Sequence, residues 1–148
     1  MCIRDRNNAV ASCVVFSNTG PLKNNYRLFN IPQKLSGNDI GSLEHVINRR
    51  LKYYDDPDMK PNLIVIDGGA IQLKFVQKVI SKSKHKELNV ISIVKGSKRV
   101  RATETILNKN GVVELEKYSK AFLLLQQALR SAQSSDPNHQ YLSQPHEL

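Results

Sequence analysis

The stretch that decides the fold is Leu63-Ile64-Val65-Ile66-Asp67-Gly68-Gly69. Its first four residues are apolar, and such an unbroken run is typical of a central strand covered on both faces of a sheet. The run ends at Asp67, and two glycines separate it from a helix predicted over 71–80. In an open α/β sheet, ligands bind beyond the carboxyl ends of the strands. The stretch therefore predicts an α/β fold with an aspartate at a ligand-binding edge.

Segments on both sides of this stretch extend the pattern. Apolar runs predict strands over 9–16, 26–31 and 90–94 and a hairpin formed by 105–107 and 112–115. Helical spacing of apolar residues predicts helices over 39–54 and 120–128. The order is strand, strand, helix, strand, helix, strand, hairpin, helix. This order predicts a mixed sheet with helices packed on it.

The charge of the chain favours a polyanionic partner. The 148 residues include 22 Lys and Arg against 13 Asp and Glu, a formal charge of +9. Nucleic acid and an anionic membrane surface both fit such an excess. No apolar stretch approaches the roughly 20 residues of a membrane span, so we expect no membrane anchor. The two cysteines, Cys2 and Cys13, are too few for a disulfide framework and fit a cytoplasmic protein.

Asp67 is the best candidate for chemistry. A carboxylate is the hard ligand that Mg²⁺ prefers, and Mg²⁺ bridges to phosphate oxygens. Gly68 and Gly69 leave backbone room for a phosphate to approach, and the amino end of the following helix favours anions. The alternative is that Asp67 simply caps that helix.

Several short motifs resemble the nuclease domain of the bacterial excinuclease protein UvrC in the same order and spacing. They are Val10-Ala11-Ser12-Cys13-Val14-Val15-Phe16, Gly20-Pro21-Leu22-Lys23, Tyr26-Arg27-Leu28-Phe29-Asn30-Ile31, Gly37-Asn38-Asp39, Arg49-Arg50, Ile66-Asp67-Gly68-Gly69 with Gln72-Leu73, and Lys95-Gly96 with Glu104-Thr105. Each motif alone would be weak, but their shared order over 9–128 is specific.

The resemblance implies an α/β fold of the RNase H-like type, a mixed sheet flanked by helices, here with its first strand missing. It implies a DNA endonuclease, dependent on Mg²⁺ or Mn²⁺, that makes the 5′ incision in nucleotide excision repair. The implied partners are damaged double-stranded DNA and, in the full-length protein, the excinuclease protein UvrB. The implied setting is the cytoplasm and the SOS response.

The resemblance also carries site residues onto this chain. Asp67 falls on a catalytic, metal-binding aspartate, and Asp39 falls on a second required aspartate. For Asp39 the alternative is a capping role, because a helix is predicted to start there. The first aspartate of the family would precede the chain, and the position of its histidine holds Gln133. We therefore expect this fragment to be inactive as a nuclease.

Basic residues are candidates for DNA binding. They are Arg49, Arg50, Lys95, Lys98, Arg99 and Arg101. The stretch 95–101 leaves a strand end on the same edge as Asp67, which favours a phosphate contact. Arg49 and Arg50 could instead be the solvated face of a helix. The alternative function is a non-catalytic nucleic-acid-binding domain of the same fold. A third, another RNase H-like nuclease such as a resolvase, would need further carboxylates on the last helix.

The two ends of the chain lack the strand and helix patterns that we find over 9–128. Residues 1–8 are expected to be a non-native or disordered leader, and the nuclease domain is expected over 9–128. Residues 129–148 are expected to be an irregular tail, broken by Pro137 and Pro145. A reading-frame slip near Leu129 would explain why the resemblance stops inside a helix. The alternative is a diverged, inactive terminus.

Overall fold

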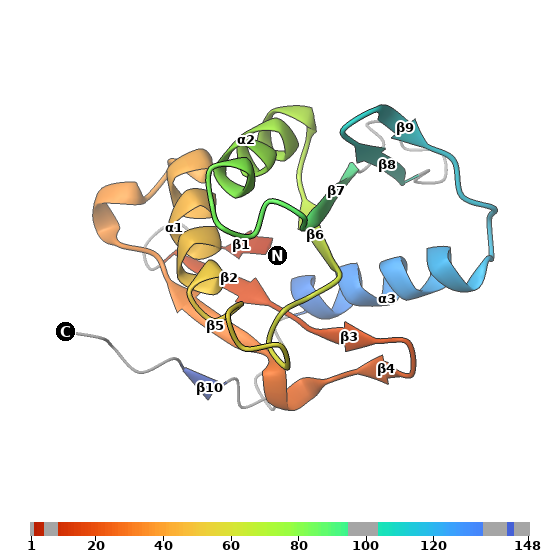
Figure 1. Cartoon of the computed structure of the whole chain (residues 1–148), viewed down its shortest axis with the longest axis horizontal. Coiled ribbons are helices and arrows are strands. Elements are labelled where there is room, and N and C mark those ends of the chain that lie inside the picture. Colours follow the sequence, from red (N-terminus) through yellow and green to blue (C-terminus); the bar gives the residue numbers. More distant parts are fainter. Residues whose placement is uncertain (1, 5–8, 95–103, 135–141, 144–148) are drawn as a thin grey trace. The chain divides into compact units, whose positions relative to one another are not determined.

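The computed structural model describes residues 2–4, 9–94, 104–134 and 142–143 (Figure 1). They form two compact units. The first comprises Met1–Ser42 and Leu115–Leu148, and the second comprises Leu43–Glu114. Each unit contains one four-stranded sheet with both parallel and antiparallel neighbours. The predicted α/β class with mixed strand pairing and helices is therefore confirmed. The described strands form these two four-stranded sheets and one small two-stranded sheet.

The sheet of the first unit is built around two predicted strands, those expected over 9–16 and 26–31. Its strands, in spatial order, are β1 (Cys2–Arg4), β2 (Val10–Cys13), β5 (Arg27–Asn30) and β10 (Leu142–Ser143). Pairs β1–β2 and β2–β5 are antiparallel, and β10 runs parallel to β5. The connection from β2 to β5 contains a small second hairpin and a helical turn, namely β3 (Phe16–Ser17), β4 (Gly20–Pro21) and the 3₁₀ turn Lys23–Asn25. A second 3₁₀ turn, Gln33–Leu35, follows β5.

Helix α3 (Lys120–Gln133) covers β2 in this unit. Ser119 caps it, because its Oγ accepts a hydrogen bond from the backbone N–H of Phe122 at 3.2 Å. Near the other end, the hydroxyl of Ser12 donates to the carbonyl oxygen of Ala132 at 2.6 Å. This bond satisfies both a buried side chain of β2 and one of the last carbonyls of the helix.

Both ends of the chain differ from our expectation. Cys2–Arg4 pair with β2, in the segment that we expected to be a non-native or disordered leader; residues 1 and 5–8 lie outside the described residues. An open strand edge offers backbone hydrogen bonds to any extended segment. Helix α3 continues through Gln133 instead of stopping at Ala128, and Leu129 and Ala132 are buried on one of its faces. The expected irregular tail therefore does not begin at Leu129. The rest of the expected tail, residues 135–141 and 144–148, lies outside the described residues.

The sheet of the second unit carries the stretch that we used to predict the fold. Its strands, in spatial order, are β6 (Leu63–Asp67), β7 (Asn89–Val94), β8 (Thr105–Asn108) and β9 (Gly111–Val113). Strands β6 and β7 are parallel, and the other pairs are antiparallel. Helix α2 (Ala70–Ser81) connects β6 to β7 and packs on β7 and β8 with Leu73, Val76 and Ile80 buried. The predicted strands and helix of this region are confirmed.

The position of β6 corrects one prediction. We expected a central strand covered on both faces, but among the described strands β6 stands at one edge of its sheet. Ile64 and Ile66 are buried, whereas Leu63 is 41% exposed. A strand with a neighbour on one side only is covered less completely, so an apolar run can still have one partly open face.

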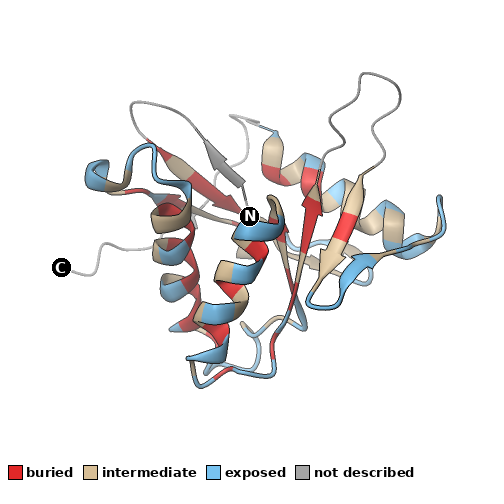
Figure 2. Ribbon diagram, turned by 90° about the horizontal axis from the view of Figure 1, so that it is seen from above, coloured by how far each residue is buried: buried red, intermediate tan, exposed pale blue. Residues whose placement is uncertain are grey.

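Helix α1 (Asp39–Leu51) begins in the first unit and continues in the second. The apolar positions that predicted it are buried along one stripe: Leu43, Val46, Ile47, Leu51 and, just beyond the helix, Tyr54. Figure 2 shows the same division on the helices, with red buried residues on one side and pale blue exposed residues on the other. The 3.6-residue period of the sequence therefore located this helix correctly.

Tyr118 stands in an unfavourable backbone conformation. The N–H of Ser119 donates to the carbonyl of Glu116 at 3.0 Å, which makes Tyr118 the third residue of a turn. Its φ of 73° is typical of the type II turn, where glycine is preferred because a Cβ is crowded there. The ring is 75% exposed, so its packing offsets little of this strain.

We predict that Tyr118→Gly stabilises the protein by about 0.5–1 kcal/mol, because glycine adopts positive φ without a steric cost. The urea midpoint of unfolding measures the change. Tyr118→Ala is the control, since it removes the ring but keeps the crowded Cβ. Equal midpoints for the two variants would contradict the assignment of strain.

Candidate functional site

Asp67 lies at the carboxyl end of β6, as the sequence predicted, but β6 stands at one edge of the described sheet and is not the central strand that we expected. Its side chain is half-buried, and it is paired in register with Ile93 of the parallel strand β7. The N–H of Gly68 donates to the carbonyl of Ile93 at 3.3 Å, which extends the β6–β7 pairing one residue beyond Asp67. The carboxyl ends of β6 and β7 therefore meet beside this carboxylate.

Asp67 is not the N-cap residue of α2. The N-cap residue is Gly69, and its N–H donates to Oε1 of Gln72 at 3.0 Å. Gly68 is packed closely, since a Cβ at this position would lie 3.2 Å from Cβ of Gln72. The corner therefore depends on small residues, and the capping alternative for Asp67 is disfavoured because another residue occupies the N-cap.

Asp39 is likewise not the cap of its helix. The N–H of Gly41 donates to Oδ1 of Asn38 at 2.9 Å, so Asn38 is the capping residue. Asp39 is the first residue of α1 and is exposed. A carboxylate in the first turn is favoured by the helix dipole. The cap that we considered for Asp39 is therefore provided by its neighbour, and its carboxylate faces solvent. Asp39 belongs to the first unit and Asp67 to the second.

The predicted DNA-binding residues divide into three groups. Arg49 is half-buried on α1. Arg50 is only 3% exposed, and its guanidinium carbon lies 5.5 Å from the ring centroid of Tyr54. Neither of our interpretations of Arg50, a phosphate contact or a solvated face, fits this position. The remaining four, Lys95, Lys98, Arg99 and Arg101, lie outside the described residues.

The position of Arg50 follows from the sequence pattern that predicted α1. It stands four residues after Val46 and three after Ile47, both buried on the apolar stripe. A long cation at such a position packs its stem with the stripe and its charge on an aromatic face. The helical spacing of Arg50 relative to the apolar residues therefore indicated its burial better than its charge did.

A second buried polar group was missed because it lies in a connecting segment. His85 follows α2 and is 6% exposed, with Nε2 3.3 Å from Oδ1 of Asp55 and its ring edge-on to Tyr54. Lys84 also pairs with Asp55. The hydrogen bond from Lys84, with the nearby charges of Lys84 and His85, lowers the pKa of the exposed Asp55 carboxyl below its ordinary value. Only tertiary contacts reveal this cluster.

Within the described residues, no group of three or more His, Cys, Asp or Glu side chains is arranged to hold a metal ion. In the same part of the chain, no helix is long and apolar enough to cross a bilayer. Asp67 is thus a single half-buried carboxylate at a strand end, beside two glycines and a helix amino terminus.

Comparison with known proteins assigns this arrangement to a family. Residues 4–133 match the family model of the UvrC RNase H endonuclease domain. Similar curated proteins include UvrABC system protein C from Legionella pneumophila (strain Paris), 35% identical over 79% of this chain and 19% of the relative. The same protein from Nitrosococcus oceani is 40% identical over 66% of this chain and 16% of the relative. The counterpart from Aliivibrio fischeri is 39% identical over 69% and 17%.

The chain belongs to the family of UvrC RNase H endonuclease domains. The match covers most of the chain, and the mixed α/β order agrees with an RNase H-like domain. It also includes Leu129–Gln133, the end of α3 that we had placed in an irregular tail. The chain spans about a fifth of the length of the curated relatives that it matches.

Proposed function

We propose that this chain is part of an excinuclease protein that makes the 5′ incision at damaged DNA in nucleotide excision repair, with Asp67 as a metal-binding carboxylate. The observation that carries the proposal is the family match together with the place of Asp67 at the β6–α2 corner. Asp39, exposed at the start of α1, is the second carboxylate proposed to serve the reaction.

The residues at the turn between β6 and α2 provide part of what a hard divalent cation needs. Mg²⁺ is commonly held by one or two carboxylates together with substrate phosphates, so a lone carboxylate is a weak site until DNA is present. A bound Mg²⁺ or Mn²⁺ would polarise the scissile phosphate and activate water. The Gly68-Gly69 backbone and the amino end of α2 would accept the phosphate beside Asp67.

The setting of the whole protein is proposed on the same basis. It would act in the cytoplasm on damaged double-stranded DNA, as part of the SOS response and together with the excinuclease protein UvrB. The net charge of +9 supports a nucleic-acid partner. The same charge also supports the second candidate, a non-catalytic DNA-binding domain of the same fold.

We predict that the purified 148-residue chain binds DNA in a salt-sensitive way but nicks damaged plasmid at less than about one hundredth of the rate of a full-length UvrC protein. The reason is that the described residues provide no cluster of metal ligands, and one carboxylate binds Mg²⁺ poorly. Plasmid nicking with Mn²⁺ measures the rate. Strong nicking by the chain that disappears in Asp67→Asn would refute the expected inactivity. Failure to bind DNA would refute both candidate functions.

A further inference from the structure

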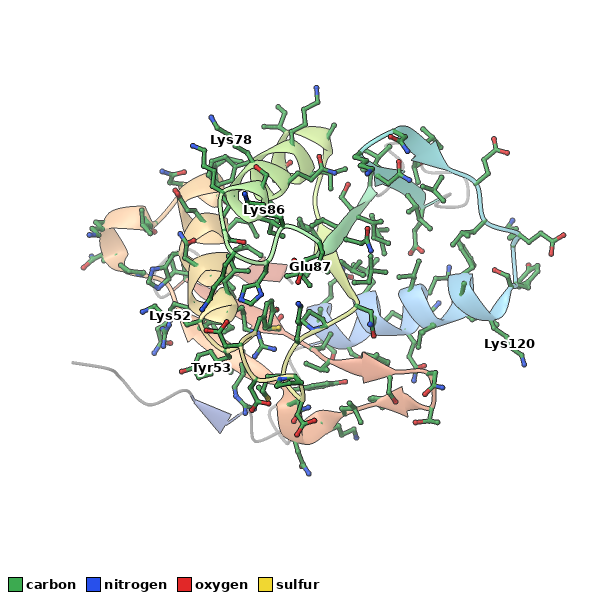
Figure 3. The ribbon with its side chains drawn as sticks, viewed as in Figure 1. Lys52, Tyr53, Lys78, Lys86, Glu87 and Lys120 are labelled. Atoms are coloured by element: carbon green, nitrogen blue, oxygen red, sulfur yellow. The ribbon has the colours of Figure 1, made fainter. Side chains whose placement is uncertain are left out.

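The outer face of α2 carries a row of like charges that the site does not use. Lys74, Lys78 and Lys82 follow at intervals of four residues along α2 and its C-cap, and all three are exposed. We call these three residues the α2 lysine stripe. Figure 3 labels Lys78, which points away from the body of the protein.

A solvated helix face normally mixes charges of both signs, but α2 contains no Asp or Glu. Two like-charge pairs at a spacing of four residues destabilise the helix. The helix dipole compensates for cations in the last turn, which accounts for Lys78 and Lys82 but not for Lys74. Among the described residues, none of the three forms an ion pair within 4.0 Å.

The geometry of the stripe suits a nucleic-acid backbone. Residues four apart on a helix are separated by about 6 Å along its axis, so the stripe is roughly 12 Å long. Phosphates of one DNA strand follow each other at about 3.4 Å along the duplex axis, so successive lysines match about every second phosphate. The stripe starts little more than one turn beyond Gly69, the N-cap beside Asp67.

A membrane surface is the other polyanion to consider. A helix that lies on a bilayer inserts an apolar face between the headgroups. The apolar face of α2 is already buried, with Leu73, Val76 and Ile80 between 0% and 3% exposed. Ile71, near the amino end of α2, is an exposed large apolar residue of this helix (74%), so little apolar surface remains beside the stripe for insertion into a bilayer, which favours DNA.

We propose that the α2 lysine stripe binds the phosphate backbone of DNA. The bound backbone would follow α2 from its amino end beside Asp67 toward its carboxyl end. This inference rests on the proposed function and adds a surface to it. Each lysine would release about one counterion from the DNA, so the stripe would account for a defined part of the salt dependence of binding.

The test compares two triple variants of the full 148-residue chain. The first, Lys74→Gln/Lys78→Gln/Lys82→Gln, removes the stripe. The second, Lys34→Gln/Lys109→Gln/Lys117→Gln, removes three exposed lysines outside α2 and so changes the net charge equally. Glutamine has nearly the helix propensity of lysine, and loss of the like-charge pairs favours α2, so the stripe variant should fold.

Binding of a fluorescein-labelled DNA duplex is measured by anisotropy over a range of salt concentrations. We expect the stripe variant to lose at least about tenfold in affinity at low salt, with a salt slope smaller by about 2–3, and the control to change much less. Equal losses in both variants would overturn the stripe while leaving DNA binding intact. Loss of binding to anionic vesicles but not to DNA would also overturn it. A wild-type chain that does not bind DNA would contradict the proposed function itself.

Discussion

A full-length UvrC protein that carries this domain with Asp67→Asn should lose at least about a hundredfold in the rate of 5′ incision, while its affinity for damaged DNA stays within about twofold. Loss of residues that merely support a metal ligand typically costs 10–100-fold, and loss of a ligand should cost at least as much. Asparagine has almost the shape of aspartate, so β6, with Ile64 and Ile66 buried, should be unaffected.

Incision of a substrate with one defined lesion, with Mg²⁺ and with Mn²⁺, measures this rate. Asp58→Asn is the matched control, because it removes the same charge from an exposed residue of the segment between α1 and β6. We expect the control to incise like the wild type. Wild-type incision by Asp67→Asn would remove this residue from the site, and a parallel loss of DNA affinity would show that the carboxylate serves folding or binding instead.

Phe29→Ala should destabilise the first unit by about 3–5 kcal/mol, the usual cost of removing a buried phenylalanine. The side chain of Phe29 is 0% exposed, and the residue is paired in register with Ala11 of β2. A neighbour as small as alanine cannot fill the cavity, so little relaxation should reduce the cost.

Amide hydrogen exchange in β2 and β5 measures this loss locally, which matters because the chain has two units. Phe16→Ala is the control, since it makes the same truncation at a half-buried position in β3. We expect the control to lose clearly less protection. Equal effects of the two substitutions would contradict the assignment of Phe29 to the core.

The sequence by itself determined the elements whose signals are local. The unbroken apolar run of β6, the helical spacing of α1 and α2 and the hairpin around Asn110-Gly111 were all predicted close to their observed bounds. It also determined where Asp67 lies on its strand and which family the chain belongs to. These properties depend on residue type and spacing along the chain, which a sequence displays directly.

Properties that depend on contacts between distant residues were decided only by the tertiary structure. The edge position of β6 depends on which strands pair, and the continuation of α3 to Gln133 depends on packing and on the bond from Ser12, 120 residues earlier. The burial of His85 against Asp55 is of the same kind. Local patterns indicate which secondary structure a segment prefers. Its burial and its strand pairing depend on contacts with residues that are distant in the sequence.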